Sequence, residues 1–79
     1  MQVAKHQRVQ VVLNIPAHRL VAYYQGEVDT VVAEATDGRI IRFPANVLRG
    51  VVQNHGVYGT FELVFDSRNK FVSIQRIDD

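Results

Sequence analysis

The chain has 79 residues, which is enough for one small domain and too few for two. It carries nine Lys and Arg residues against eight Asp and Glu, a net charge of +1, whereas proteins that coat DNA or RNA usually show a strong basic excess. It has no cysteine, so disulfides, thiolate metal sites and cysteine nucleophiles are excluded.

The start of the chain does not resemble a secretion signal. Residues 1–8 lack the apolar stretch that follows the charged residues of such signals. The longest apolar runs fall far short of the roughly 20 residues that a membrane-spanning helix needs. We therefore expect a cytoplasmic protein without membrane association, with residues 1–6 as a flexible tail and residues 7–79 as a single domain.

The first third of the chain predicts a strand, a helix and a second strand. Apolar and polar residues alternate over residues 7–15, which is typical of a half-buried strand. Residues 17–25 have the i, i+3, i+4, i+7 spacing of a short amphipathic helix, with Tyr24 in the apolar stripe and Tyr23 on its flank. Residues 28–36 are rich in valine and predict the second strand.

A tight hairpin is predicted at Asp37 and Gly38, a dipeptide typical of two-residue type I′ turns. Such a turn places Val32 opposite Phe43 on one face of the sheet. Because Phe43 is large, its face is expected to be in the core, and the other expected core residues are Leu20, Phe61 and Leu63. The other face of the second strand is then expected to be partly exposed, and it carries Val31, Ala33 and Ala35.

The rest of the chain predicts a helical turn, a loop and a second hairpin. Pro44 stands early and Gly50 late in residues 44–50, as in a single helical turn, and Leu48 is its expected anchor in the core. Residues 51–59 contain two glycines and a histidine and are expected to form a loop. The last two strands flank a four-residue turn at 66–69, which places Leu63 opposite Val72.

These elements predict an α+β domain in the order β-α-β-β-(short α)-β-β. We expect one twisted antiparallel sheet of about five strands, with the helix packed on one face. A helix of about nine residues is ~14 Å long and cannot cover both faces of such a sheet. The uncovered face therefore meets water, a loop or another chain, so we expect either a monomer or a symmetric dimer.

No arrangement of residues typical of catalysis or metal binding is found. His6, His18 and His55 lack the spacing of a metal site. Ser67 and Ser73 do not lie in the turn that presents a nucleophilic serine. We expect no enzymatic activity, no metal and no cofactor.

The remaining candidates are aromatic and basic residues for contact with a partner. Three candidate arginines lie around the first hairpin and the helical turn. One arginine and one tyrosine lie on the helix, and a second tyrosine precedes the last hairpin. The candidate contact residues are Arg19, Tyr23, Arg39, Arg42, Arg49 and Tyr58. The function that we expect is that of a small protein-interaction module. The alternative is RNA or DNA binding through Arg39, Arg42 and Arg49.

Four segments of the chain form a recognisable set: YYQG at residues 23–26, DGRIIRFPA at 37–45, GVYGTF at 56–61 and DSRNKFVS at 66–73. Together they resemble a family of short bacterial proteins that is catalogued as a domain of unknown function. The resemblance covers roughly residues 9–77. One departure is that the helix begins PAHR at 16–19, where the family tends to have a serine and acidic residues. The resemblance implies a fold and a small intracellular protein, but no substrate, cofactor or catalytic residue.

Overall fold

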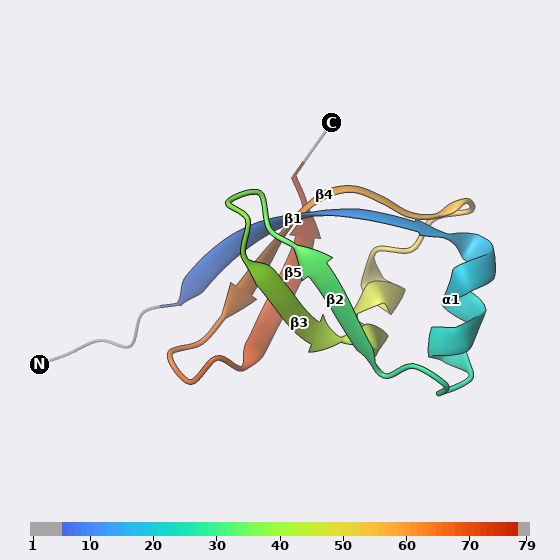
Figure 1. The fold of residues 1–79 in the computed structure, drawn as a ribbon, viewed down its shortest axis with the longest axis horizontal. Coiled ribbons are helices and arrows are strands. Elements are labelled where there is room, and N and C mark those ends of the chain that lie inside the picture. The colour runs from blue at the N-terminus through green and yellow to red at the C-terminus, as the bar shows by residue number, and fades with distance from the viewer. Residues whose placement is uncertain (1–5, 78–79) are drawn as a thin grey trace, which may run out of the picture.

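A computed structural model of the protein describes residues 6–77. Residues 1–5 of the predicted tail lie outside the described residues. The elements follow the predicted order (Figure 1). They are β1 (Gln7–Pro16), α1 (Ala17–Tyr24), β2 (Thr30–Glu34), β3 (Ile40–Pro44), the 3-10 helix η1 (Ala45–Gly50), β4 (Gly56–Phe65) and β5 (Phe71–Arg76).

The strands form two antiparallel sheets, so the prediction of a single five-stranded sheet is wrong. One sheet has the order β1-β4-β5, and β2 and β3 form the other. The two sheets meet at an isolated bridge between Val11 and Ala35. Away from this bridge the β2–β3 hairpin crosses in front of the three-stranded sheet (Figure 1). This arrangement buries the apolar faces of both sheets against each other, which one flat sheet with a single short helix cannot do.

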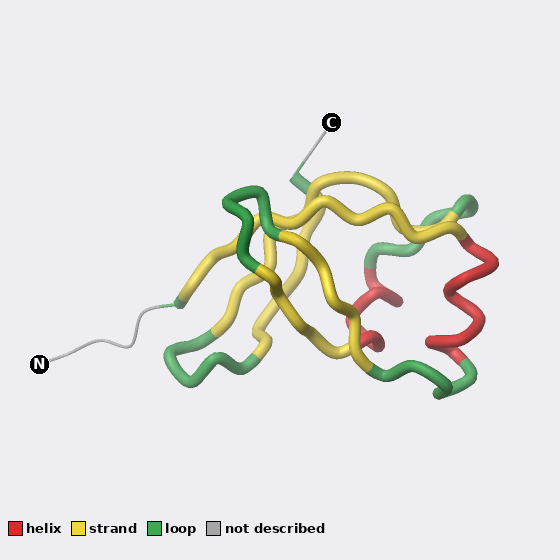
Figure 2. The backbone as a smooth tube through the Cα atoms, viewed as in Figure 1, coloured by secondary structure: helices red, strands yellow, loops and turns green. Residues whose placement is uncertain are grey.

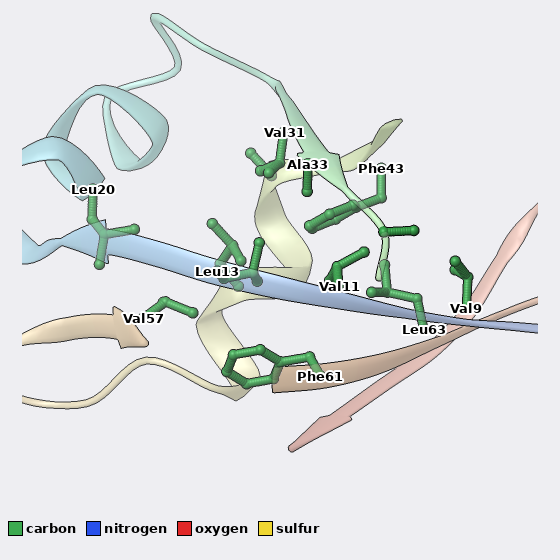
Figure 3. Packing of buried hydrophobic residues seen from close by; sticks show 13 residues of the cluster. Val9, Val11, Leu13, Leu20, Val31, Ala33, Phe43, Val57, Phe61 and Leu63 are labelled. Atoms are coloured by element: carbon green, nitrogen blue, oxygen red, sulfur yellow. The ribbon is translucent and has the colours of Figure 1, made fainter. Parts of the chain in front are cut away.

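The core lies between the two sheets, with α1 and η1 closing one end. Side chains of β2 and β3 point toward those of β1 and β4 (Figure 3). Four of the residues predicted to be in the core are buried, which confirms these predictions: Leu20, Phe43, Phe61 and Leu63. Leu48 of η1 is fully buried, which confirms it as the anchor of the short helical turn.

The predicted register of the first hairpin is wrong by one residue. Val31, and not Val32, lies opposite Phe43. The loop contains three residues, 36–38, because the N–H of Gly38 donates to the C=O of Ala35 at 2.9 Å and Gly38 has a φ of 94°. A slip of one residue exchanges the two faces of a strand. Val31 is therefore 3% exposed and Val32 is 58% exposed.

The face on which a dimer was expected is consequently part of the core. Val31, Ala33 and Ala35 are all buried against the three-stranded sheet. The hairpin itself covers the sheet face that α1 is too short to cover, so a second chain is not needed there. The choice between monomer and dimer stays a prediction. The uncovered sheet face no longer supports the dimer.

Helix α1 turns Leu20 and Tyr23 toward the core. Leu20 is buried and Tyr23 packs against the core, whereas Tyr24 is 44% exposed and Val21 is also exposed. The prediction that Tyr24 is buried and Tyr23 flanks the stripe is therefore wrong. The orientation of the helix is set by its contacts with β1, β4 and η1, which the helical spacing alone does not contain.

Strand β4 begins at Gly56, so residues 56–59 are not the predicted loop. They pair with the end of β1, where Gly56 lies opposite Pro16, and Val57 is fully buried. Glycine is required at position 56 because β1 passes very close. A Cβ atom there would lie 2.1 Å from the carbonyl oxygen of Ile15. Gly56, which suggested a loop, thus permits the close contact between β1 and β4.

The last hairpin also differs from its predicted register. Leu63 lies opposite Ile74 and not Val72. Asn69 has a φ of 65° in the turn, and an irregularity near the end of β4 shifts the pairing further. Ile74 thus packs against the core and Val72 is exposed. Within residues 6–77, no helix is long and apolar enough to cross a membrane.

Candidate functional site

The six predicted contact residues lie in four different places. Two of these places combine a pair of them: Arg19 with Tyr23, and Arg39 with Arg42. The guanidinium of Arg49 lies 5.7 Å from the ring centre of Tyr24, at the contact of η1 with α1. Tyr58 is exposed on β4, and its C=O accepts a hydrogen bond from Arg76.

A groove opens where β1 and β2 diverge. In the part of the chain that the structure describes, pairing of β1 with β2 is confined to the Val11–Ala35 bridge. Beyond the bridge, β1 continues toward α1 while β2 turns away from it (Figure 2). The resulting groove has a volume of about 350 Å³. Residues 12–15 and 31–34 form its walls, and Arg19 and Tyr23 of α1 line it as well.

The β1 wall turns peptide groups toward the groove. The C=O of Gln10 accepts a hydrogen bond from the N–H of Thr36 at 2.8 Å, so the peptide groups of Gln10 point toward β2. Peptide groups alternate in direction along a strand, so those of Val12 and Asn14 point the same way. The ladder from β1 to β4 is made by the intervening residues, whose peptide groups point the other way.

The β2 wall also turns peptide groups toward the groove, from the side opposite β1. The N–H of Ala35 donates to the C=O of Arg39 at 2.7 Å, so the peptide groups of Ala35 point toward β3. By the same alternation, the peptide groups of Val32 point toward β1 and into the groove. The groove is thus bordered by two strand edges that face each other.

The side chains around the groove are mainly apolar. Leu13 and Ala33 are buried at its base, and Val12 and Val32 are exposed at its rim. Arg19 is the cation of the groove and Glu34 is its anion. The arrangement suits an extended chain, which offers main-chain hydrogen-bonding groups and alternating side chains.

A second, smaller space lies along the outer edge of β3. This β3 cleft has a volume of about 260 Å³ and is lined by side chains of β1, β3 and the β4–β5 hairpin. Arg39 and Arg42 contribute the cations, and Gln7 and Asn69 contribute the amides. Arg49 does not line it, so the three arginines expected to form one basic surface do not share one cleft.

The first hairpin holds Arg39 in place. Asp37 accepts hydrogen bonds from the backbone N–H of Arg39 at 3.1 Å and from its Nε at 2.8 Å. The backbone N–H, followed by the guanidinium, lowers the pKa of Asp37 below its ordinary value of 3.8. No ion pair of Arg42 is found among the described residues, 6–77.

The described residues place no three His, Cys, Asp or Glu side chains where they could hold a metal ion. His6, His18 and His55 are exposed.

Sequence reasoning missed the groove and the residues of its walls. The sequence predicts Val12 and Asn14 only as members of a strand and Val32 as a core residue opposite Phe43, because the divergence of β1 from β2 is a property of the packed sheets. A usable signal was the exposed position of Val12 in the predicted first strand, since it alternates with the core residues Val11 and Leu13.

The protein is thus a small, mainly β domain of two antiparallel sheets and one short α-helix. The model of a family described as "Protein of unknown function (DUF2835)" matches residues 7–77, and the chain belongs to this family. The resemblance to a family of unknown function is therefore confirmed. No curated protein and no solved structure matches the chain.

Proposed function

We propose that the protein is a non-enzymatic interaction module that binds an extended segment of a partner protein in the groove between β1 and β2. The observation that carries this proposal is the divergence of two strands whose peptide groups face each other across the groove. Exposed strand edges recognise extended peptides through main-chain hydrogen bonds, and neighbouring pockets provide the specificity.

The composition of the groove favours a particular kind of segment. Exposed Val12 and Val32 can cover apolar side chains of the bound segment, and burial of such surface stabilises a complex by about 25 cal/mol per Å². Arg19 on α1 and Glu34 on β2 offer opposite charges. A segment with alternating apolar residues, an acidic residue for Arg19 and a basic residue for Glu34 is therefore the expected partner.

A proline in the β1 wall tests this proposal. Asn14→Pro removes the N–H that points into the groove, while the β1–β4 ladder is made by the neighbouring residues. Peptides are selected from a random library on the wild-type protein, and their affinities are then measured for the variant. We expect binding to weaken by about tenfold or more, because one main-chain hydrogen bond is lost and the proline ring obstructs the edge.

Arg8→Pro is the matched control, because the peptide groups of Arg8 also point away from β4 but lie outside the groove. This control should keep the wild-type affinity. The proposal is wrong if selected peptides bind Asn14→Pro as tightly as wild type. A pull-down from native lysate, with and without nuclease treatment, tests the alternative function. Capture that depends on intact nucleic acid would favour the alternative function through Arg39 and Arg42.

A further inference from the structure

We propose that the β3 cleft is a second binding site, which takes a small organic anion: a carboxylate or phosphate group on a compact apolar body. The site does not rest on the function proposed for the groove. The groove follows the edge of β2 that faces β1, and the β3 cleft follows the opposite edge of the same hairpin.

Arg42 supplies the positive charge of the β3 cleft, and Arg39, whose charge is balanced by Asp37, adds further N–H donors. Arg39 is oriented by its two hydrogen bonds to Asp37, which occupy its backbone N–H and its Nε. Its terminal nitrogens are not used in these bonds. Arg42 has no ion pair among residues 6–77, so its charge is available to a ligand. Arginine binds carboxylate and phosphate oxygens in pairs through its planar fork of N–H groups.

The backbone of β3 adds donors at the same place. The C=O of Arg39 accepts the hydrogen bond from Ala35, so the peptide groups of Arg39 and of alternate residues after it point toward β2. The peptide groups of Ile40 and Arg42 consequently point outward, along the cleft. Within the described residues, β3 is paired with β2 alone. The peptide groups present both N–H and C=O outward, and the N–H groups beside the Arg42 guanidinium are donors for an anion.

The opposite wall of the cleft is held in a fixed position. Asn69 lies in the β4–β5 turn, whose conformation is secured by the Asp66 side chain. The carboxylate of Asp66 accepts hydrogen bonds from the N–H groups of Arg68 at 2.8 Å and Lys70 at 2.9 Å. The acids of the two neighbouring turns, Asp37 and Asp66, do not line the cleft, and their carboxylates accept hydrogen bonds within their own turns.

The base of the cleft is apolar and its volume is small. Val9 is buried, and Ile41 and Phe65 are partly buried against the core. At about 260 Å³, the cleft is below the usual range of about 300–1,000 Å³ for sites of drug-sized ligands. A compact anion with an apolar body fits these dimensions. A polynucleotide needs a longer basic surface, and Arg49 lies elsewhere, over Tyr24.

NMR titration of the ¹⁵N-labelled full chain tests the site with phenylacetate, phenyl phosphate and inorganic phosphate. The two aromatic probes distinguish a carboxylate from a phosphate, and inorganic phosphate tests the need for the apolar body. We expect saturable shifts at Ile40, Ile41, Arg42 and Asn69 with at least one aromatic probe. The effect should be weaker with inorganic phosphate.

Arg42→Gln should weaken the binding about tenfold or more, because a charge-assisted pair of hydrogen bonds is lost. Arg42→Lys should bind less tightly than wild type, because it keeps the charge but not the fork. Arg68→Gln removes an exposed charge in the nearby turn and should change the affinity less than about twofold. Both positions, Arg42 and Arg68, are exposed, so the fold is retained.

The proposal is overturned if no probe causes saturable shifts up to about 10 mM, well above the millimolar affinity of weak ligands. It is also overturned if Arg42→Gln and Arg68→Gln have equal effects, which would show general charge attraction. Saturable binding of a single-stranded oligonucleotide with shifts extending to Arg49 would overturn it in favour of a nucleic-acid surface.

Discussion

A side chain at Gly56 has no space in this fold, which makes Gly56→Ala the sharpest test of the β1–β4 pairing. The added Cβ would lie 2.1 Å from the carbonyl oxygen of Ile15 and 2.8 Å from the backbone N of Ala17. Both neighbours are backbone atoms, so the contact cannot be relieved by turning a side chain. The φ of Gly56 is also 130°, a value that alanine rarely adopts.

The cost follows from these two effects. The backbone strain costs roughly 1–3 kcal/mol. Separating the strands also breaks the hydrogen bond from the N–H of Ala17 to the C=O of His55, at about 1 kcal/mol, and disturbs fully buried Val57. The strain and the lost hydrogen bond together cost roughly 2–4 kcal/mol, and the disturbance of Val57 adds to this. A chain of 79 residues has a free energy of unfolding of only about 4–12 kcal/mol, so the loss is a large part of it.

Urea and thermal unfolding followed by circular dichroism measure this loss. A domain of this size loses about 4–8 °C of Tm per kcal/mol, so a loss of about 2 kcal/mol or more predicts a decrease in Tm of at least about 8 °C. Gly38→Ala is the first control, because Gly38 has a φ of 94° but nothing within 4 Å of an added Cβ. It should show the strain alone, roughly 1–2 kcal/mol.

Gly50→Ala is the second control and should be close to neutral, because position 50 has open space and no positive φ. Equal losses for Gly56→Ala and Gly38→Ala would refute the close approach of β1 to β4. A stable Gly56→Ala variant would refute the pairing of Gly56 with Pro16 altogether.

Two further predictions concern the hairpins. Val31→Lys should destabilise the protein by roughly 3 kcal/mol or more, because it buries a charge, whereas Val32→Lys on the exposed face should change the free energy of unfolding by less than about 0.5 kcal/mol. Denaturant unfolding of both variants checks the register. A larger loss of stability for Val32→Lys than for Val31→Lys would contradict the observed register and support the two-residue turn. The second prediction is a loss of stability in acid. Backbone N–H groups lower the pKa values of Asp37 and Asp66 in the folded protein. The two carboxylates therefore stabilise the fold above their ordinary pKa of 3.8, and this stabilisation is lost as the pH falls through the lowered folded pKa values. The double variant Asp37→Asn, Asp66→Asn should flatten the dependence of Tm on pH below about pH 4, and an unchanged slope would show that other carboxylates cause it.

The elements of this fold could be predicted from local sequence. Alternation predicted β1, helical spacing predicted α1, and Pro44 and Gly50 bounded η1 correctly. The large core residues Phe43, Phe61 and Leu63 were also recognised, because bulky apolar side chains in a short chain have few other places to go. These features depend on residues that are neighbours along the chain.

The candidate sites depend on contacts between distant segments, and there the sequence was insufficient. Both hairpin registers were wrong because the favoured turn is decided by how the flanking strands pack, and Asp37-Gly38 is compatible with loops of two or three residues. Helical spacing already places Arg19 beside Tyr23 on α1, but only the packing of the two sheets sets Val12 and Val32 beside this pair and Phe65 and Asn69 beside Arg42. The groove itself exists because β1 and β2 part after one bridge. That divergence is the geometric result of folding a hairpin over a sheet to bury Val31 and Phe43, and no local pattern encodes it.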